Sequence, residues 1–298
     1  MSALSSKPDF RPEVHGHRGC RGLLPENTIP AFLHALALGV DVLEMDVIIS
    51  ADNKVVVSHE PWLNPTICLD PVGNAIESQT PPHFNLFQLP YATIRLCDCG
   101  QLRHPGFPAQ QSQPAHKPLL SEVLSLIDDA ALRLGRPPIR YSIEIKSSPE
   151  GDFVYHPEPA RFLALVLADL RAAQVLARTT LLCFDARILR LARQLEPSLA
   201  TCFLIEEEEP WLPSIQSLGF VPTSFGPNVQ TVTPDAVRQL RGAFPGLRLV
   251  PWTANTTGEF QQLIRLQVDG ITTDFPDALI TLLNTDTTPA SLFNPNQR

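Results

Sequence analysis

The segment EVHGHRGCRGLLPENTIPAFLHALALGVDVLEMDVII, residues 13–49, decides the fold of this chain. It begins with a short apolar run at 13–17, passes through a polar turn into a helical pattern at 31–39, and ends in a second apolar run at 41–48. Extended, helical and extended segments in this order are typical of a right-handed β–α–β unit with parallel strands. We therefore expect a parallel α/β fold.

The same alternation continues along the rest of the 298-residue chain. Further strand-like runs lie at 54–58, 139–146, 179–184, 200–205, 220–225, 247–253 and 269–273. Helical patterns separate most of them, at 119–135, 158–176, 185–195, 233–244, 256–267 and 276–284. Nine strand-like runs exceed the eight strands of a closed barrel, and we expect 220–225 to be an extended loop. An open doubly wound sheet is the weaker alternative, because no Gly-x-Gly-x-x-Gly follows the first run. The sequence predicts a (β/α)8 TIM barrel.

Residues 60–117 interrupt this alternation. The segment has no helical period, is rich in Pro, Gln, His and Asn, and follows the third strand-like run at 54–58. A loop of this length inside a compact domain is usually functional. We expect an irregular cap insertion after the third strand, over the barrel face that carries the active site. The domain prediction is a single barrel over residues 1–298 with an insertion subdomain at about 60–117.

The composition limits the partners of the protein. The net charge is −8 and the sequence pI is about 5.5, which does not favour binding to nucleic acid. No apolar run approaches the roughly 20 residues of a membrane-spanning helix, so we expect no integral membrane segment. The first residues, MSALSSKPDFRPEV, lack the apolar region of a signal peptide, and we expect a cytoplasmic protein. An anionic substrate would need a local cluster of cations.

The six cysteines have no metal-binding spacing. Only Cys97 and Cys99 lie close together in the sequence, and Cys183 lies in the apolar run TTLLCFD. The even count makes disulfides possible, but free thiols are the expectation for a cytoplasmic enzyme, with Cys183 buried.

Carboxylates occur inside two of the strand-like runs. Glu44 and Asp46 are two residues apart, which places them on one face of a strand, and Glu144 lies in the run YSIEIKSS. Such residues are expensive to bury unless they are paired or bind a metal ion. The three could supply oxygen ligands to Mg²⁺ or Ca²⁺. The alternative is a buried ionic network with Arg18 and Lys146.

Cations and histidines occur at the ends of the same runs. Arg18 and Lys146 provide the local positive charge that a phosphodiester requires in an acidic protein. Histidine is the side chain best suited to proton transfer near neutral pH, so His17 and His59 are candidates for the acid and the base. Trp252 could form an apolar wall for the substrate, with simple barrel packing as the alternative.

Several neighbouring residues are less clearly assigned. Glu26 could stabilise the start of a helix through the helix dipole, or it could contact Arg18. Asn27 could equally cap a helix or help to build the site. We expect His15, Asp269 and Asp274 to be structural.

Five segments together resemble the glycerophosphodiester phosphodiesterase family. They are HGHRGCRGLLPENTIPAF at 15–32, GVDVLEMDVIISADNKVVVSHE at 39–60, IEIK at 143–146, VPWTAN at 250–255 and DGITTDFPD at 269–277. Each is a weak signal alone, but they occur in the family's order across nearly the whole predicted barrel. In one place the sequence differs, because Glu60 follows His59 where the family usually has Asp.

The resemblance implies a fold, a reaction and a set of roles. The fold is a barrel like that of the phosphatidylinositol phosphodiesterases, with an insertion after the third strand that we expect to contact the substrate's alcohol group. The reaction is hydrolysis of a small glycerophosphodiester to sn-glycerol 3-phosphate and an alcohol, a step of lipid and glycerol metabolism. The implied metal ligands are Glu44, Asp46 and Glu144, the catalytic pair is His17 and His59, and the phosphate contacts are Arg18 and Lys146.

Two other functions are kept as alternatives. The first is a related phospholipase D-type enzyme that acts on lysophospholipid or sphingomyelin substrates. The second is a catalytically silent binding protein, which would be expected to have lost one of the histidines or carboxylates. The sequence does not identify the alcohol, the metal ion, the acid and the base among the histidines, or the oligomer.

Overall fold

The computed structural model describes residues 10–78, 84–206 and 209–285. Residues 1–9, on which most of the cytoplasmic expectation depends, lie outside the described residues. Within the described ranges, no helix has both the length and the apolar character needed to cross a membrane.

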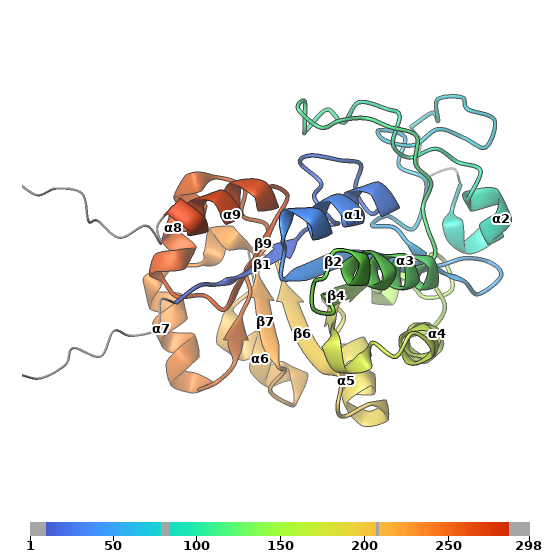
Figure 1. Ribbon diagram of the computed structural model, residues 1–298. Coiled ribbons are helices and arrows are strands. Elements are labelled where there is room, and N and C mark those ends of the chain that lie inside the picture. Colours follow the sequence, from blue (N-terminus) through green and yellow to red (C-terminus); the bar gives the residue numbers. More distant parts are fainter. Residues whose placement is uncertain (1–9, 79–83, 207–208, 286–298) are drawn as a thin grey trace, which may run out of the picture.

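Eight parallel strands form the centre of the molecule (Figure 1). Their order around the sheet is β8-β7-β6-β5-β4-β2-β1-β9. Backbone hydrogen bonds join the two ends of this order: Asp269 N–H donates to Leu249 O at 2.8 Å, and Thr272 N–H donates to Pro251 O at 3.1 Å. The strands are β1 (Glu13–Gly16), β2 (Val42–Ile49), β4 (Arg140–Ile145), β5 (Thr179–Cys183), β6 (Ala200–Ile205), β7 (Ser224–Pro227), β8 (Arg248–Leu249) and β9 (Gly270–Thr273). The predicted TIM barrel is confirmed.

One of the nine strand-like runs lies outside the eight-stranded barrel, but it is not the run at 220–225 that we expected. β7 begins inside the run 220–225 and pairs with both β6 and β8, so the prediction of a loop there was wrong. The strand outside the parallel barrel is β3 (Val55–Val57), which pairs antiparallel with β2. A turn containing Asn53, at a φ of 58°, reverses the chain between β2 and β3. An apolar run of three valines has the same pattern in a hairpin as in a barrel strand, so the sequence could not distinguish them.

Helices surround the barrel (Figure 1). The first, α1, has Thr28 as its N-cap, Pro30 in its first turn and Gly39 at its end with a φ of 101°. α1 spans Ile29–Leu38, and the others around the barrel are α3 (Leu120–Arg133), α4 (Pro159–Ala172), α5 (Ala186–Leu195), α6 (Trp211–Leu218), α7 (Pro234–Ala243), α8 (Thr257–Arg265) and α9 (Pro276–Thr285). The short helix α2 (Tyr91–Ile94) lies in the segment after β3. Phe32 and Leu36 of α1 are fully buried in the main core between helices and strands.

The segment after β3 has a small core of its own. Its buried side chains include Leu63, Leu86 and Ile94, and they pack against Ile48 and Val56 of the hairpin. A disulfide joins Cys68 to Cys99 across this segment, so the expectation of free thiols was wrong for these two. The other four cysteines are free and buried, Cys183 among them as expected.

This segment packs on the loops that follow β1 and β4, on the side where the barrel strands end. The Gln110 side chain donates to Arg21 O at 2.7 Å, and the Asn85 side chain donates to Val154 O at 2.7 Å. Figure 1 shows the segment beyond the ends of α1 and α3, away from α7 and α8. Its treatment as a subdomain spanning 60–117 stays a prediction.

Candidate active site

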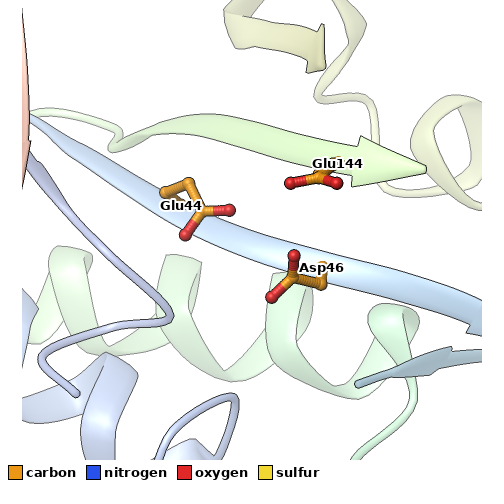
Figure 2. Close-up of side chains that lie close together, drawn as sticks. All are labelled: Glu44, Asp46 and Glu144. Atoms are coloured by element: carbon orange, nitrogen blue, oxygen red, sulfur yellow. The ribbon is translucent and has the colours of Figure 1, made fainter. Parts of the chain in front are cut away.

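Three carboxylates converge on one point at the end of the barrel strands. Glu44 and Asp46 lie on β2, and the parallel register pairs Asp46 with Glu144 on β4. All three are buried, and each offers one oxygen within 4.8 Å of the others. Figure 2 shows the three carboxylates facing a common space between the two strands. The sequence prediction that these residues lie together agrees with this geometry.

Repulsion among the three buried carboxylates is unfavourable unless a cation compensates their charge. Burial and the neighbouring Asp46 raise the pKa of Glu44 well above its ordinary value. Burial also raises the pKa of Glu144, although Lys146 opposes that rise. For Asp46 burial acts in the same direction, but Arg18 and other cations outweigh it and hold its pKa below the ordinary value. Three buried oxygen ligands of this kind could hold a divalent ion.

Two cations border the cluster. The Arg18 guanidinium is paired with Glu26 at 2.7 Å and with Asp46 at 3.2 Å. The backbone N–H of Arg18 donates to the Glu44 carboxylate at 2.8 Å. Lys146 Nζ lies 2.6 Å from Glu144 Oε1 and 3.7 Å from Asp46 Oδ1. The ionic network that the sequence offered as an alternative therefore exists. It does not exclude an ion, because each carboxylate has several lone pairs.

His17 is held by a buried carboxylate that the sequence did not assign to the site. Its Nδ1 lies 2.6 Å from Asp274 Oδ1, and the two residues are 8% and 2% exposed. Asp274 was expected to be merely structural, and this contact corrects that view. The signal was in the strand register: Gly16 pairs with Thr273, so the next residue of each strand, His17 and Asp274, must lie side by side.

Asn255 fixes Asp274 in turn. Its side-chain amide donates to Asp274 Oδ2 at 2.7 Å, and its side-chain carbonyl accepts the Asp274 N–H at 3.0 Å. Burial alone would raise the pKa of Asp274, but His17 and the other partners hold it below the ordinary value. His17, Asp274 and Asn255 therefore form one chain of hydrogen bonds.

His59 has a carboxylate partner as well, in a more open setting. Its Nδ1 lies 3.1 Å from Glu60 Oε1, which also accepts from the Asn64 amide at 3.3 Å. The His59 and Glu60 side chains are 30% and 19% exposed. Burial opposes the charge on Glu60, but His59 and Lys117 lower its pKa to about 2. The residue that departs from the family pattern is therefore a partner of the histidine and lies outside the acidic cluster.

Glu26 and Asn27 belong to the site. Glu26 bridges Arg18 and Arg21, the latter at 2.6 Å, and Asn27 donates to Asp46 Oδ2 at 2.8 Å. The helix N-cap is the following residue, as described above. Both open alternatives are thereby resolved in favour of the site.

Trp252 forms part of an apolar wall opposite the acidic cluster. Its ring meets Phe184 edge-on at a centroid distance of 5.4 Å, and both pack against Leu182, Cys202 and Leu204. Its Nε1–H donates to Gly226 O at 2.8 Å. Trp252 therefore packs inside the barrel and also faces the cavity.

One cavity of about 380 Å³ connects these groups. Its wall includes His17, Glu44, His59, Glu144 and Trp252. None of the described residues in 60–78 and 84–117 lines it, so the expected contact between the cap and the alcohol group has no support in this cavity.

The Glycerophosphoryl diester phosphodiesterase family model matches residues 17–278. The chain belongs to this family. A glycerophosphodiester phosphodiesterase from Bacillus altitudinis is 27% identical over 275 residues, which cover 90% of this chain and 96% of that protein. A crystal structure from Silicibacter pomeroyi, of a protein whose name places it in the same family, is 30% identical with a TM-score of 0.82 and covers 94% and 95% of the two chains.

A third similarity concerns the fold alone. A phosphodiesterase from Oleispira antarctica, solved in complex with the product sn-glycerol-3-phosphate, has a TM-score of 0.71 at 19% identity. The alignment covers 92% of this chain and 98% of that one.

Proposed function

We propose that this protein hydrolyses glycerophosphodiesters to sn-glycerol 3-phosphate and an alcohol, using Mg²⁺ or Ca²⁺. One observation carries the proposal: two carboxylates of the buried trio (Glu44 and Glu144), two cations and two carboxylate-held histidines border a single cavity. The name of the Bacillus altitudinis relative and the bound product of the Oleispira antarctica structure support the same substrate class. This reaction places the protein in glycerol and lipid metabolism.

The substrate's phosphate is held by Arg18 and Lys146, whose charges offset the net −8 of the chain. Glu44, Asp46 and Glu144 would hold the divalent ion, which when bound would supply Lewis-acid stabilisation of the phosphate's negative charge. Arg18 is pre-positioned for this role because its guanidinium is fixed by Glu26 before substrate arrives.

His17 and His59 act as the acid–base pair. Asp274 is hydrogen-bonded to Nδ1 of His17, and Glu60 is hydrogen-bonded to Nδ1 of His59. The Nε2 atom of each ring is thereby left to contact the substrate. One imidazole removes the proton from the attacking hydroxyl, and the other, as imidazolium, protonates the departing alkoxide. The substrate's own glycerol hydroxyl attacks first, and water then opens the cyclic phosphate. Trp252 provides the apolar wall beside the glycerol.

Release of sn-glycerol 3-phosphate from glycerophosphocholine tests this proposal. A chelator should abolish release by the full chain, and Mg²⁺ or Ca²⁺ should restore it. Asp235→Asn, at an exposed carboxylate on α7, serves as the matched control and should leave the rate unchanged. Full activity in excess chelator would contradict the metal role, and rapid turnover of lysophosphatidylcholine alone would favour the phospholipase D-type alternative.

A further inference from the structure

Small side chains, most of them polar, line the middle of the barrel, where most barrels of this type carry bulky branched residues. Five strands each contribute one such residue to the cavity wall: Ser142, Thr180, Cys202, Ser224 and Thr272. The register makes them neighbours, because Ser142 pairs with Thr180 and Cys202 pairs with Ser224. His15 pairs with Thr272 and lines the same cavity. We call these six residues the barrel chamber.

The barrel chamber is continuous with the proposed active site. The same cavity is lined by Lys146 beyond one end of β4 and by Arg140 at the other end. Six residue steps along a strand correspond to about 20 Å. Ser142 lies two residues before Glu144, on the same face of the strand. A phosphodiester held near Arg18 has two ester arms, so one can point toward solvent while the other enters the chamber.

Three of the chamber's four hydroxyl groups have no protein partner among the described residues. Ser142, Thr180 and Thr272 make no side-chain hydrogen bond within the ranges that the structure describes. Ser142 and Thr272 are 3% and 5% exposed. The Ser224 hydroxyl has a long contact of 3.5 Å to Thr201 O and is also hydrogen-bonded to the Cys202 thiol, a neighbour within the chamber. Buried polar groups are normally hydrogen-bonded, so this ring is suited to a guest that both donates and accepts hydrogen bonds.

The floor of the chamber is unfavourable for a cationic guest. Both oxygens of Glu13 are engaged, by Arg140 at 2.7 Å and by Arg248 at 2.7 Å. His15 Nε2 lies 3.3 Å from Glu13, and burial lowers the pKa of this histidine. Two guanidinium groups therefore face one carboxylate. Glu13, the carboxylate of this floor, is therefore already in ion pairs, whereas Glu44, which pairs with Ser142 in the register, belongs to the acidic cluster.

We propose that the barrel chamber is a specificity subsite for the leaving alcohol, which it binds when that alcohol is a neutral polyol such as inositol. This inference rests on the proposed function. The alcohol's hydroxyls would exchange hydrogen bonds with Ser142, Thr180 and Thr272, while Leu182 and Leu204 contact its carbon skeleton. Choline, which has no free hydroxyl once esterified and carries a positive charge, would bind less well.

The test compares glycerophosphoinositol with glycerophosphocholine on the full chain with its divalent ion. The wild-type kcat/KM should be at least about 10-fold higher for the inositol substrate. Thr272→Val and Thr180→Val keep the side-chain shape and remove one hydroxyl. Each should lower the inositol-to-choline ratio by about 3–10-fold, the usual effect of one lost hydrogen bond. Thr201→Val makes the same change on β6 outside the cavity wall and should leave the ratio within about twofold.

Turnover of glycerophosphocholine in each variant serves as the folding control. An unchanged ratio in both chamber variants, with both substrates hydrolysed, would overturn the subsite and leave the proposed function standing. An equal loss on both substrates would also overturn it, because the chamber would then bind the glycerol arm that all these substrates share. Hydrolysis of neither substrate by the wild type would instead contradict the proposed function itself.

Discussion

The two histidine–carboxylate pairs of the site differ in how firmly each ring is held. His17 and Asp274 are joined at 2.6 Å with side chains 10% and 3% exposed, and Asn255 fixes the carboxylate from the far side. His59 and Glu60 are joined at 3.1 Å, with side chains 30% and 19% exposed, and the pair lies on a loop after β3. The attraction in an ion pair is stronger where water is excluded. Loss of Asp274 should therefore lower turnover more than loss of Glu60.

The largest effect should come from removing the imidazoles themselves. His17→Asn and His59→Asn should each lower kcat by about 10²–10⁴-fold, with the fold retained. Because the pair acts as one unit, the double variant should fall little below the worse single variant. A p-nitrophenyl substrate needs less protonation of its leaving group and should partly rescue whichever variant lacks the acid. Near wild-type turnover in both single variants would remove the histidines from the chemistry.

The next effect separates the two pairs directly. Asp274→Asn should lower kcat by about 10²-fold, because the amide cannot stabilise an imidazolium at Nδ1 and can impose the wrong tautomer. Glu60→Gln should lower it by about 10-fold or less, since solvent can replace part of the lost interaction. Both should leave KM within about threefold and shift one limb of the pH profile of kcat/KM. Equal losses at the two positions would show that burial does not distinguish them.

The smallest expected effect is on how the free energy of unfolding depends on pH. Asp274 has a folded-state pKa below its ordinary value, because His17 and its other partners outweigh the opposing effect of burial. A depressed carboxylate pKa stabilises the fold above the unfolded value of about 3.9 and ceases to do so as pH falls through the folded value. The unfolding free energy of the wild type should therefore exceed that of Asp274→Asn at pH 7, and the difference should shrink below about pH 4. Asp235→Asn, exposed on α7, should show no such dependence.

Much of the site could be predicted because it lies on strands. Two carboxylates at positions 44 and 46 must share a strand face, and the ends of parallel strands meet at one edge, so the trio and the two cations were expected together. The fold followed from the alternation of strands and helices in the same way. Both predictions depend only on backbone periodicity, which the sequence displays directly.

The missed features depend on contacts between distant segments. Asp274 meets His17 across 257 positions, and Cys68 meets Cys99 through the packing of an irregular segment. The barrel chamber likewise depends on which residues of six strands face the cavity. Register between strands is set by the whole barrel, so these contacts needed the structure.

Binding of Ca²⁺ or Mg²⁺, measured by calorimetry beside turnover of glycerophosphocholine, tests the central claim most directly. The account assigns the ion to the carboxylate trio and the proton transfers to the histidine pairs. The wild type should bind one ion, Glu144→Gln should lose both binding and turnover, and His17→Asn should bind the ion normally while losing turnover. Stoichiometric binding with full activity in Glu144→Gln, or loss of the ion in His17→Asn, would contradict this division of roles.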